Sequence, residues 1–101
     1  MDLATHTLDF ELLRRDRNRF ILQCQRTIAI IVRFHIQKGM FPASEFDDIV
    51  QSVNEELIRR LDGVARNFNG SVMLSTYMNV VIRNICLRIH ERRLRAPVTE
   101  P

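Results

Sequence analysis

Helix-breaking residues are scarce in this chain and fall in three places. The 101 residues include three glycines and three prolines, namely Gly39, Pro42, Gly63, Gly70, Pro97 and Pro101. Proline lacks a backbone donor and clashes with the preceding helical turn, so the long segments without it favour helix. The chain is therefore expected to consist of a few long helices that are separated at these breaks.

The segment from about residue 8 to residue 38 has helical periodicity. Its buried positions are expected at steps of three and four, on one face of a helix: Phe20, Cys24, Ile28, Ile31 and His35. A break is expected near residues 16–18, and Gly39 supplies a C-terminal stop. His35 ends the stripe and is expected either to cap the helix or to lie at the edge of the core.

Two further segments have the same periodicity. The first is expected over residues 44–62, begun by a capping-box variant of Ser44 and Asp47 and ended by Gly63. Its stripe is Phe46, Val50, Val53, Leu57 and Leu61. The second is expected over residues 74–95, with the stripe Leu74, Met78, Val81, Ile85 and Ile89. Residues 64–73 form the expected loop, and residues 96–101 form a tail or the start of a linker.

Amphipathic helices that must hide their stripes against one another predict an all-α fold, a compact bundle of three to four helices in one domain. Apolar residues make up 46% of the chain, enough for one core. No apolar run approaches the roughly 20 residues that span a bilayer, so no membrane contact is expected. No secretory signal opens the sequence, which favours the cytoplasm. Cys24 and Cys86 are expected as apolar core residues.

Arginine dominates the basic residues. The formal net charge is +3, and Lys38 is the single lysine. Arginine grips phosphates and carboxylates with a planar fork, although codon bias also explains such an excess. Basic and polar residues follow helical spacing in the last segment: Asn84, Arg88, Arg92 and Arg95, broadened by Arg83 and Arg93. This stripe predicts a phosphate track. The helix dipole accounts for Arg92 and Arg93 without any ligand.

The second helical segment has a polar side, formed by Asp47, Asp48, Gln51, Asn54, Glu55 and Glu56. Acidic residues in a first turn complement the helix dipole, which explains Asp47 and Asp48 without a partner. The uncharged Gln51 and Asn54 in mid-helix favour a protein interface.

Three short motifs on these segments have a familiar order. Residues 47–51 read Asp-Asp-Ile-Val-Gln, residues 75–77 read Ser-Thr-Tyr, and residues 82–84 read Ile-Arg-Asn. Together they resemble region 2 of bacterial RNA polymerase sigma factors, over about residues 20–95. The resemblance implies a region 2-type helical bundle. It also implies a non-enzymatic role, in which the domain binds core polymerase and helps to recognise and melt the promoter −10 element.

The resemblance implies a different binding partner for each of the last two helices. The clamp helices of the largest polymerase subunit would bind Asp47, Asp48, Gln51, Asn54 and Glu55. Promoter DNA would contact the loop and the last helix through the following residues: Arg66, Asn67, Phe68, Asn69, Ser75, Tyr77, Arg83, Asn84, Arg88 and Arg92. The loop would shape a pocket for a flipped base, in which Phe68 either stacks on the base or anchors the loop to the core. An anti-sigma protein is a further partner that the resemblance allows.

Two departures from the family narrow these expectations. Val80 and Val81 stand where housekeeping members carry paired tryptophans, and the chain has no Trp. This absence favours an alternative sigma factor with a narrow promoter set. The chain is also too short for the helix-turn-helix domain that reads the −35 element, so an excised domain or a natural short form is expected.

Other functions remain open from the sequence. No catalytic constellation, cofactor motif or metal cluster is apparent, and Cys86 with His90 lacks a third ligand. A helical protein-interaction module or regulator without DNA binding is the main alternative. A compact helix-turn-helix regulator ranks last, because the helices are too long and the breaks between them are too wide.

Overall fold

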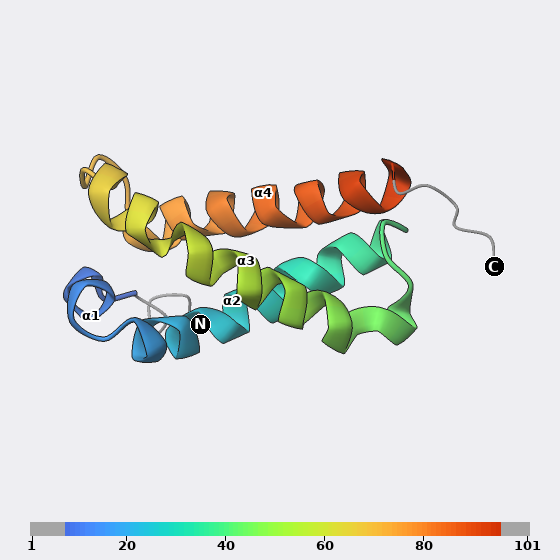
Figure 1. Cartoon of the computed structure of the whole chain (residues 1–101), viewed down its shortest axis with the longest axis horizontal. Coiled ribbons are helices and arrows are strands. Elements are labelled where there is room, and N and C mark those ends of the chain that lie inside the picture. The colour runs from blue at the N-terminus through green and yellow to red at the C-terminus, as the bar shows by residue number, and fades with distance from the viewer. Residues whose placement is uncertain (1–7, 96–101) are drawn as a thin grey trace.

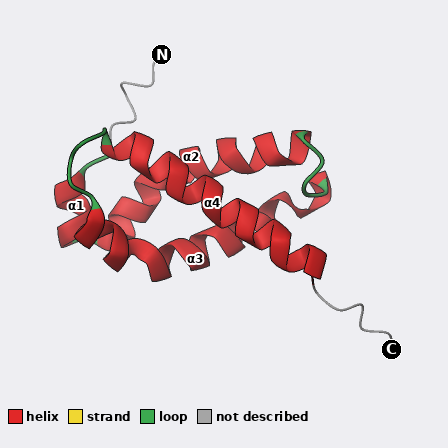
Figure 2. Ribbon diagram, turned by 90° about the horizontal axis from the view of Figure 1, so that it is seen from above, coloured by secondary structure: helices red, strands yellow, loops and turns green. Residues whose placement is uncertain are grey.

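The computed structural model describes residues 8–95, and in this range the fold is all-α, as predicted. The elements in chain order are α1 (Phe10–Arg15), α2 (Arg17–Gln37), the 3-10 helix η2 (Ala43–Glu45), α3 (Phe46–Asn67) and α4 (Leu74–Arg95). Helices α2 and α3 form a long antiparallel pair joined through η2, and α4 lies across both (Figures 1 and 2). Short helix α1 closes the end where α3 turns into α4 (Figure 1).

The break predicted near residues 16–18 is confirmed at Asp16. This residue ends α1 and begins α2, and its carboxylate accepts a hydrogen bond from the Arg19 N–H at 3.2 Å. Asp9 caps α1 in the same way, accepting from the N–H groups of Glu11 and Leu12. Side-chain caps of this kind stabilise a helix by about 1 kcal/mol each.

The turn between α2 and α3 confirms one expectation and corrects another. Gly39 has a φ of +84°, the left-handed conformation that a helix stop favours. The capping box of Ser44 is wrong, because α3 begins at Phe46 and no side chain caps it. Instead, a 3-10 turn follows Pro42, and in this turn the Glu45 N–H donates a hydrogen bond to the Pro42 carbonyl oxygen at 3.0 Å.

The predicted end of the second long helix at Gly63 is also wrong, since α3 continues to Asn67. Glycine inside a helix costs about 1 kcal/mol relative to alanine. Val64, the next residue, is buried, and this burial offsets the cost. The true turn residue is Gly70, with a φ of +81°. The connection to α4 is consequently residues 68–73, shorter than predicted.

The core lies where α2, α3 and α4 meet. The stripe predicted on the first segment is buried at every position, His35 included. On α3, Val53, Leu57 and Leu61 of the predicted stripe are buried, whereas Phe46 and Val50 are only partly buried. Ile49 is buried as well, although it was not in the predicted stripe. On α4 the buried side is wider than predicted: Val81 is only partly covered, while Ile82 and Cys86 are fully buried.

The core contains two thiols and one imidazole, those of Cys24, Cys86 and His35. Both cysteines are free and buried, and burial raises the pKa of the Cys24 thiol to about 12 and that of Cys86 to about 11. His35 lies with Nδ1 at 2.8 Å from the Ile31 carbonyl oxygen. A carbonyl oxygen only accepts, so Nδ1 carries the hydrogen.

Candidate nucleic-acid interface

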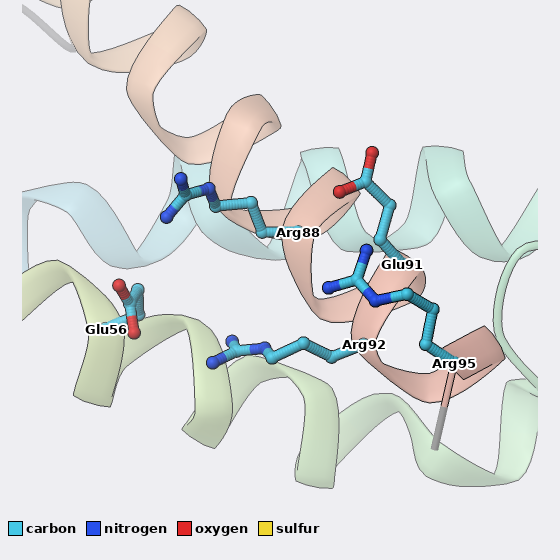
Figure 3. A pocket seen from close by; sticks show the side chains of 5 residues that line it. All are labelled: Glu56, Arg88, Glu91, Arg92 and Arg95. Carbon is cyan, nitrogen blue, oxygen red and sulfur yellow. The ribbon is translucent and has the colours of Figure 1, made fainter. Parts of the chain in front are cut away.

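A groove rich in arginine runs between α3 and α4 near the end of α4 (Figure 3). Its lining residues are Glu56 of α3 and Arg88, Glu91, Arg92 and Arg95 of α4. Steps of three and four along α4 bring these arginines to one side of the helix. The stripe predicted from Arg88, Arg92 and Arg95 is thus confirmed as an exposed row, and Asn84 continues it along α4.

Glu56 is the carboxylate that α3 contributes to this groove. Its oxygens lie 3.0 Å from Arg59 Nη1 and 3.2 Å from Arg60 Nε, and its side chain is 18% exposed. Partial burial alone would raise the pKa of Glu56. The hydrogen bond from Arg60 and the charges of Arg60, Arg59 and Arg92 outweigh it and hold the pKa below its ordinary value. Glu56 therefore stays ionised and neutralises part of the local positive charge.

The three arginines that α4 contributes to this groove are available to bind a ligand. Within residues 8–95, Arg88, Arg92 and Arg95 form no salt bridge. Arg92 extends from α4 toward Glu56 (Figure 3), whose two ion-paired partners already come from α3. The groove and its rim then contain five arginines and two carboxylates. Such an excess of guanidinium groups suits a chain of phosphates.

A second hollow is formed by the last turns of α3 and the first half of α4. Arg59, Arg60, Arg66, Asn67 and Tyr77 contribute to its lining. Arg66 and Asn67 were predicted in a loop, but they lie in the last turn of α3. The hollow brings them beside Tyr77 of α4, with Ser75 partly buried near the start of that helix.

Phe68 packs into the protein. Its ring centroid is 5.3 Å from that of Phe10 and 5.4 Å from that of Tyr77, so one aromatic cluster joins α1, the connection and α4. Of the two roles considered for Phe68, the structure thus supports the anchor. Asn69 also has a local partner: its Oδ1 accepts from the Ser71 N–H at 2.9 Å, which forms a turn around Gly70.

Two arginines do not broaden the row as predicted. Arg83 lies on the α2 side of α4, in a different groove with Ile30 and Phe34. Arg93 forms an ion pair with Glu45 of η2, and its guanidinium lies over the ring of Phe41. Arg93 therefore ties the end of α4 to the turn between α2 and α3.

Four of the five residues predicted to bind polymerase lie on an exposed side of α3. Asp47, Asp48, Gln51 and Glu55 are exposed, and Gln51 reaches toward Glu55 with 3.4 Å between Nε2 and Oε2. Asn54 does not belong to this exposed side. It turns toward α2 and forms two reciprocal hydrogen bonds with Gln25.

The geometry of this pair is specific. Gln25 Nε2 donates to Asn54 Oδ1 at 2.6 Å, and Asn54 Nδ2 donates to Gln25 Oε1 at 3.0 Å. Gln25 Nε2 also donates to the Ile21 carbonyl at 2.9 Å. Both amides are thereby satisfied inside the α2–α3 interface, which is the condition for burying them.

Sequence reasoning missed part of the groove. Glu56 was assigned only to the polar side of its helix, and Arg59 and Arg60 were not singled out. Their separations of three and four residues from Glu56 are the spacings of helical ion pairs, so a usable pattern was present.

No family model, curated protein or solved structure matches the chain in our comparisons. None of the helices between residues 8 and 95 is both long and apolar enough to cross a membrane. In the same range, no three His, Cys, Asp or Glu side chains are grouped closely enough to hold a metal ion.

Proposed function

We propose that this chain acts as a sigma-factor-like domain in transcription initiation, binding core RNA polymerase and the promoter −10 element. The observation that carries the proposal is the row of Arg88, Arg92 and Arg95, which form no salt bridge within the described residues and face an open groove. Phosphate contacts from such a row position a protein on nucleic acid and make its affinity depend on salt.

The two ends of the proposed DNA path have different chemistry. The arginine groove supplies charge, whereas the hollow at the end of α3 offers Asn67 and Tyr77 beside Arg66. An asparagine amide can discriminate bases by hydrogen bonding, and a tyrosine ring can stack on an unpaired base. We therefore assign backbone contact to the groove and base contact to the hollow, with Phe68 holding the hollow in shape.

The polymerase would bind the exposed start of α3. Asp47, Asp48, Gln51 and Glu55 form a polar surface there, separate from the arginine groove. Acidic and polar surfaces of this kind steer and orient a basic or polar partner. Asn54 is excluded from the proposed contact, because Gln25 already satisfies its amide.

The DNA half of the proposal is tested with the full chain assembled on core polymerase. Binding of −10 DNA is measured by fluorescence anisotropy against salt concentration for Arg88→Ala/Arg92→Ala. The control, Arg15→Ala/Arg26→Ala, removes the same charge from exposed positions on α1 and α2. We expect the log–log salt slope to fall by roughly 0.7 to 0.9 per lost phosphate contact in the first variant only. Equal slopes in both variants would contradict the assignment.

The polymerase half is tested by a pull-down of core enzyme. Asp48→Ala/Gln51→Ala should weaken capture, while Glu11→Ala/Gln37→Ala, which removes the same types of exposed group elsewhere, should not. Circular dichroism establishes that both variants remain helical. Unchanged capture by the first variant would remove this surface from the proposal.

A further inference from the structure

A second groove runs along the other side of α4, where it meets α2. It is lined by Ile30, Ile31 and Phe34 of α2 and by Asn79 and Arg83 of α4. Ile30 is 56% exposed and Phe34 is 47% exposed. On α4, Val80 and Leu87 are exposed one turn before and one turn after Arg83. The proposed DNA and polymerase surfaces use none of these apolar side chains.

Exposed apolar side chains that gather around a groove mark a binding surface, whereas isolated ones need no explanation. Two parallel rows of side chains on neighbouring helices form the kind of groove that accepts a third, amphipathic helix. Ile30 and Phe34 stand four residues apart on α2 and form one wall. Asn79 and Arg83, also four residues apart, form the opposite wall on α4.

The charged residues around this groove are mostly basic. Helix α2 contains no Asp or Glu among its 21 residues, and α4 contains one acidic residue, Glu91, which lines the arginine groove instead. Arg83 lines the apolar groove, and the Lys38 ammonium lies over the Phe34 ring at 5.3 Å. A partner with carboxylates beside its apolar stripe would complement both cations.

We propose that the α2–α4 groove binds an acidic amphipathic helix of another protein. A second copy of this chain fits poorly. The same face on two copies would bring Arg83 and Lys38 against like charges. The acidic side of α3 carries, among the described residues, a single exposed large apolar side chain, Ile58, which is too little to fill the groove.

The test uses the full chain and two designed peptides of about 20 residues, a length of about 30 Å as helix. Both carry leucines at steps of three and four; one has glutamates beside them and the other has lysines. We expect the glutamate peptide to bind at least tenfold more tightly, a difference of about 1.4 kcal/mol, as measured by calorimetry. Equal affinity, or no binding of the glutamate peptide up to about 1 mM, would overturn the proposal.

Variants then locate the site. Ile30→Ser/Phe34→Ser should weaken the glutamate peptide at least tenfold, whereas Leu22→Ser, at a 70% exposed position of the same helix, should not. Arg83→Glu provides a second variant at an exposed position and should reverse the preference between the peptides. An unchanged affinity in both variants would place the peptide elsewhere and refute the groove.

Two other occupants give distinct results. Self-association that is lost in Phe34→Ser, observed by sedimentation equilibrium, would replace the partner helix with a second copy. Binding of anionic phospholipid vesicles that Phe34→Ser abolishes, without peptide binding, would replace it with a lipid surface. Arg88→Ala/Arg92→Ala should leave peptide binding intact, so this proposal and the proposed function fail separately.

Discussion

The two sides of α4 differ in chemistry although they belong to one helix. Toward α3 the helix presents Arg88, Arg92 and Arg95, which line one groove with Glu56 and Glu91, and this groove is polar and cationic. Toward α2 it presents Arg83 among Ile30 and Phe34, and that groove is largely apolar. The helix packs its buried stripe between the two grooves, so each side contacts a different neighbour (Figure 2).

This difference separates two kinds of recognition. Guanidinium groups around a polar groove favour phosphates, and binding of that kind weakens steeply with salt. Apolar side chains with a few flanking cations favour an amphipathic helix, and that binding depends less on salt because burial of apolar area drives it. A single helix thus offers two surfaces whose ligands can be separated by experiment.

The largest expected effect comes from exchanging charge on each side. Arg88→Glu/Arg92→Glu places carboxylates where two phosphate contacts are proposed, and we expect −10 DNA binding to fall by roughly a hundredfold or more. Arg83→Glu should reduce DNA binding far less, because Arg83 faces the other groove. Titrations of both variants at one salt concentration measure the contrast. If Arg83→Glu is equally harmful to DNA binding, the division between the two sides of α4 is wrong.

The next effect concerns the aromatic cluster at the start of α4. Phe68→Ala removes the contacts with Phe10 and Tyr77, and we expect the free energy of unfolding to fall by about 1 to 3 kcal/mol. Chemical denaturation measures this change, and Phe68→Leu should restore much of the stability.

A base-stacking role for Phe68 makes the opposite prediction. Stability would then be unchanged, and binding of all bases would weaken by roughly 1 to 3 kcal/mol. The same two variants therefore determine whether Phe68 has a structural role or contacts DNA.

The pattern of apolar residues predicted the all-α fold and most of the core, because burial follows helical spacing within each segment. The sequence also located the break at Asp16 and the stop at Gly39, where short-range capping and backbone conformation decide the structure. The predicted helix end at Gly63 was wrong, because glycine commonly stops a helix, but here Val64, the next residue, is buried and α3 continues.

Long-range partners explain the remaining differences at the candidate site. Arg93 pairs with Glu45, which is 48 residues away, and Asn54 pairs with Gln25, which is 29 residues away. Spacing along one helix identifies which side a residue occupies but not the side chain that meets it from another helix. Arg83 was grouped with the arginine row for that reason, although its neighbours are Ile30 and Phe34.

A smaller effect is expected at the Gln25–Asn54 pair, which lies away from both grooves of α4. Asn54→Ala leaves the Gln25 amide without its partner, and we expect a loss of about 1 to 2 kcal/mol in the free energy of unfolding. Replacing both residues with leucine should recover part of this loss, because no unpaired amide remains. Thermal melts measure stability, and polymerase pull-downs should show unchanged capture. Weaker capture by a fully folded Asn54→Ala variant would return Asn54 to the polymerase surface.

The smallest effect on stability is expected at Glu56. Its pKa is lowered in the folded protein, so its contribution to stability is present above the ordinary carboxyl pKa and is lost as pH falls through the lowered value. This contribution should be below about 1 kcal/mol, as is usual for ion pairs with an exposed partner such as Arg59. Glu56→Gln should therefore flatten the acid limb of the stability profile only slightly.

The same substitution should affect the two sides of α4 unequally. Removing the carboxylate frees Arg59 and Arg60 and leaves Arg92 facing a neutral side chain, so the groove becomes more cationic. We expect tighter DNA binding with a steeper salt dependence, and unchanged binding of the glutamate peptide in the α2–α4 groove. Glu11→Gln, at an exposed position on α1, makes the same change in net charge outside the groove and outside the proposed polymerase surface, and serves as the control. If both variants tighten DNA binding equally, net charge alone drives the interaction, and the arginine groove has no special part in it.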